Sequence, residues 1–186
     1  AAIFAGAVLS YLSATNWFLE PSLGIFGVSF LALCSAAIVI QLISGLDSKK
    51  GLRAGFGTAV ALAVLYYPLQ VLMSADASFM NVIAVFAVTI SVGMMIGFVV
   101  SPIDRRVYVR IGLFTALIAT FPIIVDRFIS EFSGYMNSDA IGGRPVPTLG
   151  QANDLLTPEQ LGNFWISGLD TAMHLVLPTI ALTLIS

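Results

Sequence analysis

The stretch ASFMNVIAVFAVTISVGMMIGFVVSPI, residues 77–103, contains no charged side chain between Asp76 and Asp104. A helix needs about 20 consecutive apolar residues to cross the hydrocarbon core of a bilayer, and this stretch exceeds that length. Backbone polar groups inside a bilayer must be satisfied by the chain itself, which favours a helix over an open strand. The stretch therefore predicts a transmembrane helix.

Other parts of the chain repeat this pattern. Further stretches without charge occupy residues 1–19, 21–46, 54–75, 111–125 and 171–186. The second and third of these reach the length of a membrane span, and the others are shorter. We expect an all-α fold, a polytopic transmembrane bundle of about six helices with the last one truncated. The alternative is a buried helical core in a soluble protein, and the length and close spacing of the stretches weigh against it.

The composition points the same way. Of the 186 residues, 10% are charged and 58% are hydrophobic, and the mean hydropathy is +0.98. Soluble domains carry roughly 25% charged residues, so a soluble enzyme, a disordered tail and a disulfide scaffold are excluded. The net charge of -2 argues against a nucleic-acid partner, and Cys34, the single cysteine, has no intrachain partner for a disulfide. Because the chain begins without Met and ends inside an apolar stretch, we expect a fragment of a longer protein.

Basic residues predict the orientation. Two clusters hold six of the eight Lys and Arg residues, namely Lys49, Lys50 and Arg53, and Arg105, Arg106 and Arg110. Lys and Arg concentrate in the cytoplasmic loops of membrane proteins. We therefore expect a multi-pass protein of the cell (plasma) membrane, with both clusters cytoplasmic and residues 126–170 external.

The expected external segment contains one sharp local signal. Thr157, Pro158 and Gln160 supply the hydroxyl N-cap, the proline at the first helical position and the glutamine of a capping box. The pattern predicts a short helix that begins at Pro158 and continues over residues 161–169, interrupted by Gly162 and Gly168, with Trp165 on its apolar face. Such a helix lies on the bilayer surface or forms a lid that contacts substrate, and the first interpretation is favoured.

Motifs of catalysis are missing. The chain has no P-loop, no G-x-S-x-G turn and only one histidine, His174, so we expect no catalytic, cofactor or metal site. Asp126 and Arg127 are the nearest candidates for a proton relay within a span. An interfacial pair at the outer end of a helix is the favoured interpretation of these two residues.

Packing signals occur within the spans. Gly93 and Gly97 form a small-xxx-small pattern, which allows another helix to approach closely. Pro122 and Pro178 each remove a backbone hydrogen bond and can kink a helix. Kinks in spans suit a gated pathway, although inert bundles contain them as well.

The stretch GLDTAMHLVLPTIALTL, residues 168–184, resembles the membrane permease of dipeptide/oligopeptide ABC importers. In that family a His-Leu-x-Leu-Pro sequence opens a span that descends to the cytoplasm, and His174 to Pro178 are similar to it. Asp104 and Arg105, followed by a span that contains Phe121 and Pro122, are similar to an earlier part of the family pattern. The resemblance covers residues 79–186 and is specific over residues 168–184.

The resemblance implies a membrane-spanning permease subunit of an ABC importer for peptides or similar small solutes. Its implied partners are a second permease subunit, two cytoplasmic ATPase subunits, an external solute-binding protein and the lipid bilayer. Residues 79–186 would then form a partial permease-like domain, and residues 1–78 an additional N-terminal transmembrane region. Candidate pathway or gating residues are His174, Pro178, Asp170, Pro122 and Trp165. A non-transporting structural or assembly subunit of a membrane complex is the alternative.

Overall fold

The computed structural model describes residues 21–101, 104–136 and 156–185, and every regular element in these ranges is a helix. The helices are α2 (Gly24–Ile43), α3 (Lys49–Ala75), α4 (Phe79–Val100), α5 (Arg105–Met136), α6 (Pro158–Gly162) and α7 (Phe164–Ile185). All of them except α6 are long and apolar enough to cross a membrane. The predicted all-α helical bundle is confirmed for the described residues, and the stretch at residues 1–19 lies outside them.

The described chain packs as two units that divide within α5. The N-terminal unit is Leu23–Asp126, and the C-terminal unit contains the described residues from Arg127 onward together with Pro21 and Ser22. This division concerns packing. The boundary expected at residues 78 and 79 follows from the family resemblance and stays a prediction.

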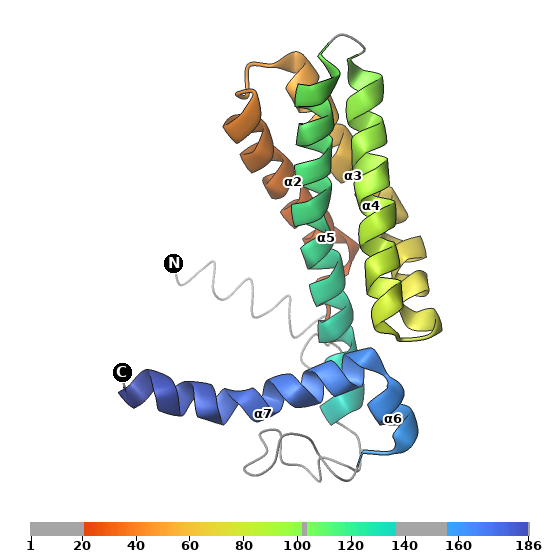
Figure 1. The fold of residues 1–186 in the computed structure, drawn as a ribbon, viewed down its shortest axis with the longest axis vertical. Coiled ribbons are helices and arrows are strands. Elements are labelled where there is room, and N and C mark those ends of the chain that lie inside the picture. The colour runs from red at the N-terminus through yellow and green to blue at the C-terminus, as the bar shows by residue number, and fades with distance from the viewer. Residues whose placement is uncertain (1–20, 102–103, 137–155, 186) are drawn as a thin grey trace, which may run out of the picture. The chain divides into compact units, whose positions relative to one another are not determined.

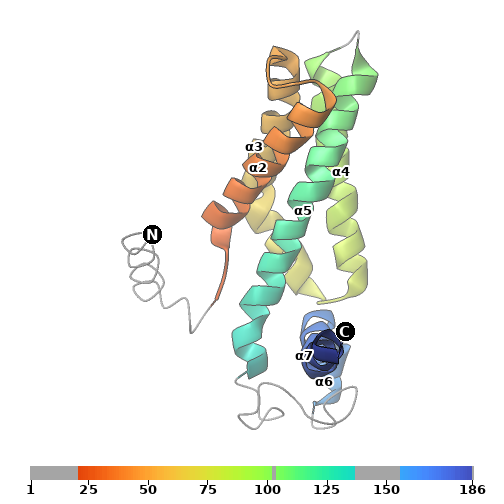
Figure 2. The same cartoon turned by 90° about the vertical axis from the view of Figure 1, so that its left-hand side faces the viewer.

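In the N-terminal unit, α2, α3, α4 and the first part of α5 run side by side and alternate in direction (Figures 1 and 2). The α2–α3 turn and the beginning of α5 lie at the same end. A hydrogen bond of 3.4 Å from Lys50 Nζ to Ser101 Oγ joins the start of α3 to the end of α4 there. Both basic clusters therefore belong to one end of this unit.

Small side chains allow the helices of this unit to pack closely. Its core includes Ala32 and Ala36 of α2, Ala54 of α3, and Ala116 and Ala119 of α5, all fully buried. Close approach without large side chains is the usual solution for membrane helices, because lipid offers no hydrophobic driving force for their association.

The predicted role of Gly93 and Gly97 is confirmed at the contact between α4 and α5. A Cβ atom at Gly93 would lie 2.4 Å from the carbonyl oxygen of Gly112, and one at Gly97 would lie 2.3 Å from that of Tyr108. The same contact contains a buried hydrogen bond of 2.7 Å from Thr120 Oγ1 to Thr89 Oγ1. Both glycines are therefore required by backbone-to-backbone contact.

Helix α5 is longer than its apolar stretch predicts. It runs from Arg105 to Met136, whereas the charge-free stretch ends at residue 125. Arg127 and Glu131, one helical turn apart, form an ion pair on the helix that offsets the charges there. Residues 126–136, which begin the segment expected to be external, continue α5, and their external position stays a prediction.

The capping box is confirmed, but the helix that follows it is shorter than predicted. Thr157 Oγ1 accepts a hydrogen bond from Gln160 N at 3.3 Å, and Gln160 Oε1 accepts one from Thr157 N at 3.0 Å. Helix α6 then ends at Gly162, because Asn163 adopts an extended conformation. The predicted start at Pro158 and the predicted interruption at Gly162 are confirmed, whereas Gly168 lies within α7, which begins at Phe164, and does not interrupt that helix.

Candidate functional site

Asn163 sets the start of α7 and so positions the candidate residues that follow. Its side-chain oxygen Oδ1 accepts hydrogen bonds from Trp165 N at 2.9 Å and from Ile166 N at 3.3 Å. These are backbone donors in the first turn of α7 that have no partner within the helix. Asn163 therefore acts as the N-cap of α7, a role that sequence reasoning missed.

An aromatic cluster anchors the first turns of α7 to the last turns of α5. The rings of Trp165 and Phe128 meet edge to face, with centroids 4.8 Å apart, and Trp165 is fully buried. Phe164 packs against the Trp165 ring at 5.1 Å. Gly168 allows this arrangement, because a Cβ atom there would lie 2.9 Å from Phe128 Cε1. Trp165 is thus a packing residue of the C-terminal unit, and its candidate role in a pathway stays a prediction.

One turn further along α7, three polar side chains converge in the interior of the C-terminal unit. Tyr135 of α5 donates a hydrogen bond of 2.8 Å to Asp170 Oδ1. His174 Nδ1 lies 2.8 Å from the backbone oxygen of Asp170 and 3.6 Å from its Oδ1. The three side chains are buried, with exposed fractions of 2% for Tyr135, 1% for Asp170 and 8% for His174. We call them the Asp170 cluster.

The geometry fixes where the proton of His174 sits. A carbonyl oxygen can only accept a hydrogen bond, so Nδ1 must carry the proton that it donates to Asp170 O. Nε2 is then the acceptor atom of the neutral ring. The nearby Asp170 carboxylate favours this arrangement, because its Oδ1 attracts the same Nδ1 proton.

The chemistry of the Asp170 cluster suits holding helices together. It contains one carboxylate, one imidazole and one phenol. The hydrogen bond from Tyr135 to Asp170 links α5 to α7, and the one between His174 and Asp170 O lies within α7. Within the described ranges, no group of three His, Cys, Asp or Glu side chains is placed to hold a metal ion. A buried ionisable group is costly unless it is paired, and Tyr135 supplies a partner for Asp170.

The two predicted prolines do not belong to this cluster. Pro178 is in α7, one turn beyond His174, and its side chain is exposed. Pro122 is in α5 within the N-terminal unit and is half-buried. Helix α5 and helix α7 are each continuous through their proline. A third proline inside a helix, Pro68 of α3, was not singled out from the sequence.

Helix α7 changes character after His174. The first half of the helix contains buried residues, whereas the second half carries exposed apolar side chains. These are Leu175, Ile180, Leu182 and Leu184, with exposed fractions from 50% to 82%. Apolar side chains exposed in this way require either lipid or another helix.

A second polar centre, in the N-terminal unit, surrounds Asp126, whose partners sequence reasoning did not identify. Asp126 Oδ1 accepts hydrogen bonds from the backbone N–H groups of Leu23 at 2.6 Å and Gly24 at 3.0 Å. Its Oδ2 accepts one from Tyr66 OH at 2.5 Å and one from Gln70 Nε2 at 3.2 Å. We call these residues the Asp126 cluster. One carboxylate thus joins α2, α3 and α5.

Asp126 replaces a cap that α2 lacks. Leu23 stands at the N-cap position of α2 and makes no side-chain capping hydrogen bond. The first backbone N–H groups of a helix need acceptors, and a carboxylate there also interacts favourably with the helix dipole. Asp126 is 1% exposed and Arg127 pairs with Glu131, so the two residues have different partners, and their position at the membrane interface stays a prediction.

One signal for the Asp126 cluster was present in the sequence. Tyr66 and Gln70 are four residues apart in an apolar stretch, which places both on one face of a helix. Two polar side chains on one face of a span indicate a polar partner on a neighbouring helix. The identity of that partner is not a local property, because Asp126 lies 60 residues beyond Tyr66.

Comparisons with known proteins gave no match: no protein-family model, no curated protein and no solved structure matches the chain. The resemblance to ABC importer permeases therefore rests on the residues quoted for it.

Proposed function

We propose that the chain is part of a membrane-spanning permease subunit of an ABC importer, which forms part of the translocation pathway for peptides or similar small solutes. The observation that carries the proposal is that α7 contains the permease-like sequence and has buried residues in its first half but exposed apolar residues in its second half. The permease-like sequence of residues 168–184 lies within this helix. Its first half is anchored by the Asp170 cluster, and its second half offers exposed apolar side chains.

This build suits a helix that must contact other parts of an assembly. A permease subunit of this kind works beside a second permease subunit, so each subunit has apolar helix surface that its own chain does not cover. Leu182 and Leu184, which are 70% and 82% exposed, supply such surface on α7. The same subunit would bind two cytoplasmic ATPase subunits and receive its solute from an external binding protein. Bond chemistry in this assembly belongs to the ATPases.

The proposal is tested by site-specific photo-crosslinking of the full-length protein in its native membrane. A photo-reactive amino acid replaces Leu182 in one variant and Val71, an exposed residue of α3, in the control. We expect the α7 variant to crosslink to a second multi-span permease subunit. We also expect paired ATPases to co-purify with both variants in mild detergent, and the solute-loaded binding protein to stimulate their ATP hydrolysis.

The result separates transport from a purely structural role. A structural or assembly subunit would co-purify with membrane proteins but with no nucleotide-binding subunit. Recovery of the full-length protein without any ATPase, under conditions that preserve known membrane complexes, would refute the importer proposal.

A further inference from the structure

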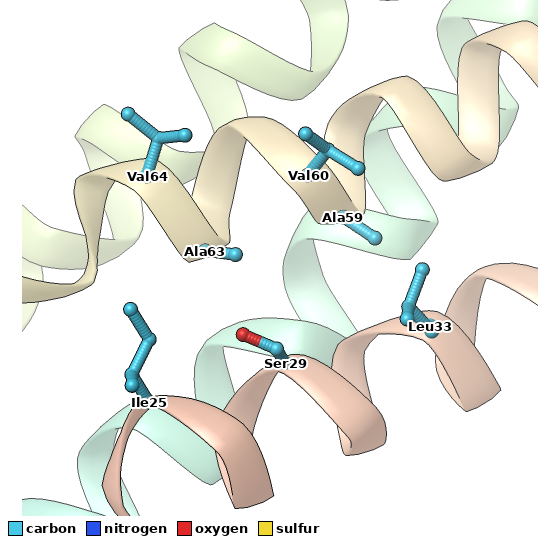
Figure 3. Close-up of a pocket in the computed structure, with 7 residues that line it drawn as sticks. All are labelled: Ile25, Ser29, Leu33, Ala59, Val60, Ala63 and Val64. Carbon is cyan, nitrogen blue, oxygen red and sulfur yellow. The ribbon is translucent and has the colours of Figure 1, made fainter.

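Two apolar hollows meet along helix α3 in the N-terminal unit. The first, of about 280 Å³, lies between α2 and α3, where Ser29 and Leu33 face the small side chains of Ala59 and Ala63 (Figure 3). The second is shallow and is lined by Arg53, Phe56 and Gly57, among others, and both include Val60. We call the face of α3 that the two hollows line, from Arg53 to Val64, the α3 groove.

The depth of the α3 groove comes from residues with little or no side chain. Gly57, Ala59 and Ala63 leave room where larger residues would fill the surface. Val60 and Val64 at its edge are 56% and 73% exposed, so no part of the described chain covers them. The groove is therefore an open apolar depression on the surface of a helix that can cross a membrane.

The length of the groove matches one leaflet of a bilayer. The eleven-residue separation of Arg53 and Val64 corresponds to about 17 Å at the helical rise of 1.5 Å per residue. Half of a hydrocarbon core of roughly 30 Å is about 15 Å. A single acyl chain thus fits along the groove with its headgroup near Arg53.

Positive charge stands at the end where a headgroup would lie. Lys49 and Arg53 are four residues apart, so both are on the face of α3 that carries Gly57 and Val60. Both side chains are exposed, and neither forms an ion pair with a residue in the described ranges. Like charges at this spacing repel each other, and an anionic group placed between them relieves the repulsion.

We propose that the α3 groove binds an anionic phospholipid, with one acyl chain along Gly57, Val60 and Ala63 and the phosphate of its headgroup at Lys49 and Arg53. The α3 groove supplies apolar contacts for the acyl chain, and Lys49 and Arg53 supply positive charge opposite the phosphate. Basic residues at the membrane surface attract anionic lipids. This inference concerns a different helix from the one that carries the importer proposal, so each can fail without the other.

The test is native mass spectrometry of the whole chain in detergent, titrated with dioleoyl phosphatidylglycerol or dioleoyl phosphatidylcholine. We expect the phosphatidylglycerol to bind about 30-fold more tightly, from a roughly fivefold contribution of each basic residue. The double variant Lys49→Gln/Arg53→Gln should lose this preference. The matched control is Arg106→Gln/Arg110→Gln, which removes the same charge at the same spacing on α5. The control should retain the preference.

A second variant tests the groove without a change of charge. Ala63→Leu fills the hollow beside Ser29 and should weaken the binding of dioleoyl phosphatidylglycerol while leaving that of the short-chain dihexanoyl lipid unchanged. If Lys49→Gln/Arg53→Gln and Arg106→Gln/Arg110→Gln lose the preference for phosphatidylglycerol equally, the preference comes from diffuse surface charge, and the proposal is overturned. Displacement of the lipid by excess inorganic phosphate, or unchanged binding in Ala63→Leu, would also overturn it.

Discussion

Replacing Asp126 by alanine removes the acceptor that joins three helices of the N-terminal unit. The carboxylate accepts four hydrogen bonds, from Leu23 N, Gly24 N, Tyr66 OH and Gln70 Nε2. At roughly 0.6 kcal/mol for each hydrogen bond between membrane helices, their loss amounts to about 2.5 kcal/mol. Buried donors left unmet add to this cost, so we expect a loss of about 3 kcal/mol or more.

The conservative variant separates the role of charge from that of hydrogen bonding. Asp126→Asn keeps one carbonyl oxygen, which can still accept from Leu23 N and Gly24 N, but its NH2 group faces the donors Tyr66 and Gln70. We expect it to lose about half as much free energy of unfolding as Asp126→Ala. Asp47→Ala is the control, because Asp47 is an exposed carboxylate in the α2–α3 turn.

Two measurements follow the effect. Unfolding in mixed micelles of rising denaturing-detergent content gives the change in global stability. Hydrogen exchange at the Leu23 and Gly24 amides gives the local change, and a loss of about 3 kcal/mol corresponds to roughly 100-fold faster exchange. If Asp126→Ala behaves like Asp47→Ala in both measurements, the capping of α2 by Asp126 is refuted.

Three further predictions concern packing, capping and topology. Gly112→Ala places a Cβ atom 2.0 Å from Gly93 O, so it should cost about 1–3 kcal/mol in the same unfolding assay. Gly134→Ala, at a helical glycine with open space, should instead stabilise by about 0.5–1 kcal/mol. Thr157→Ala removes the α6 cap and should cost about 1 kcal/mol of local stability, measured by hydrogen exchange. In intact cells, a cysteine in place of Lys50 should resist a membrane-impermeant thiol reagent, whereas one in place of Asp76 should be labelled; the reverse pattern would overturn the expected orientation.

The features that sequence reasoning predicted are those that neighbouring residues determine. Long runs without charge predicted the helices, and the spacing of Gly93 and Gly97 predicted a close helix contact. The Thr157 capping box also depends on residues within one turn, and it is present. In each case the physical cause lies in a window of a few residues, so the sequence displays it directly.

The features that were missed depend on competition between local signals or on distant partners. Asn163 ends α6 and starts α7, and its capping strength outweighs the apolar pattern that continues through residues 161–169. Its neighbours in the sequence suggest only that Asp126 marks the end of an apolar membrane span. Its donors come from positions 60 and 103 residues away, which no periodicity reveals.

The two buried carboxylates are satisfied in different ways, and the difference bears on where the protein can change shape. Asp126 accepts from backbone and side-chain donors of two other helices, so any movement of α2, α3 or α5 against another breaks a bond to one carboxylate. Asp170 accepts a hydrogen bond from Tyr135 of α5 and lies 3.6 Å from His174 Nδ1 of its own helix. The hydrogen bond from Tyr135 opposes a movement of α7 against α5, whereas the contact with His174 would move together with α7. The four hydrogen bonds to Asp126 therefore oppose movement among three helices of the N-terminal unit, and the hydrogen bond from Tyr135 to Asp170 must break if α7 moves against α5.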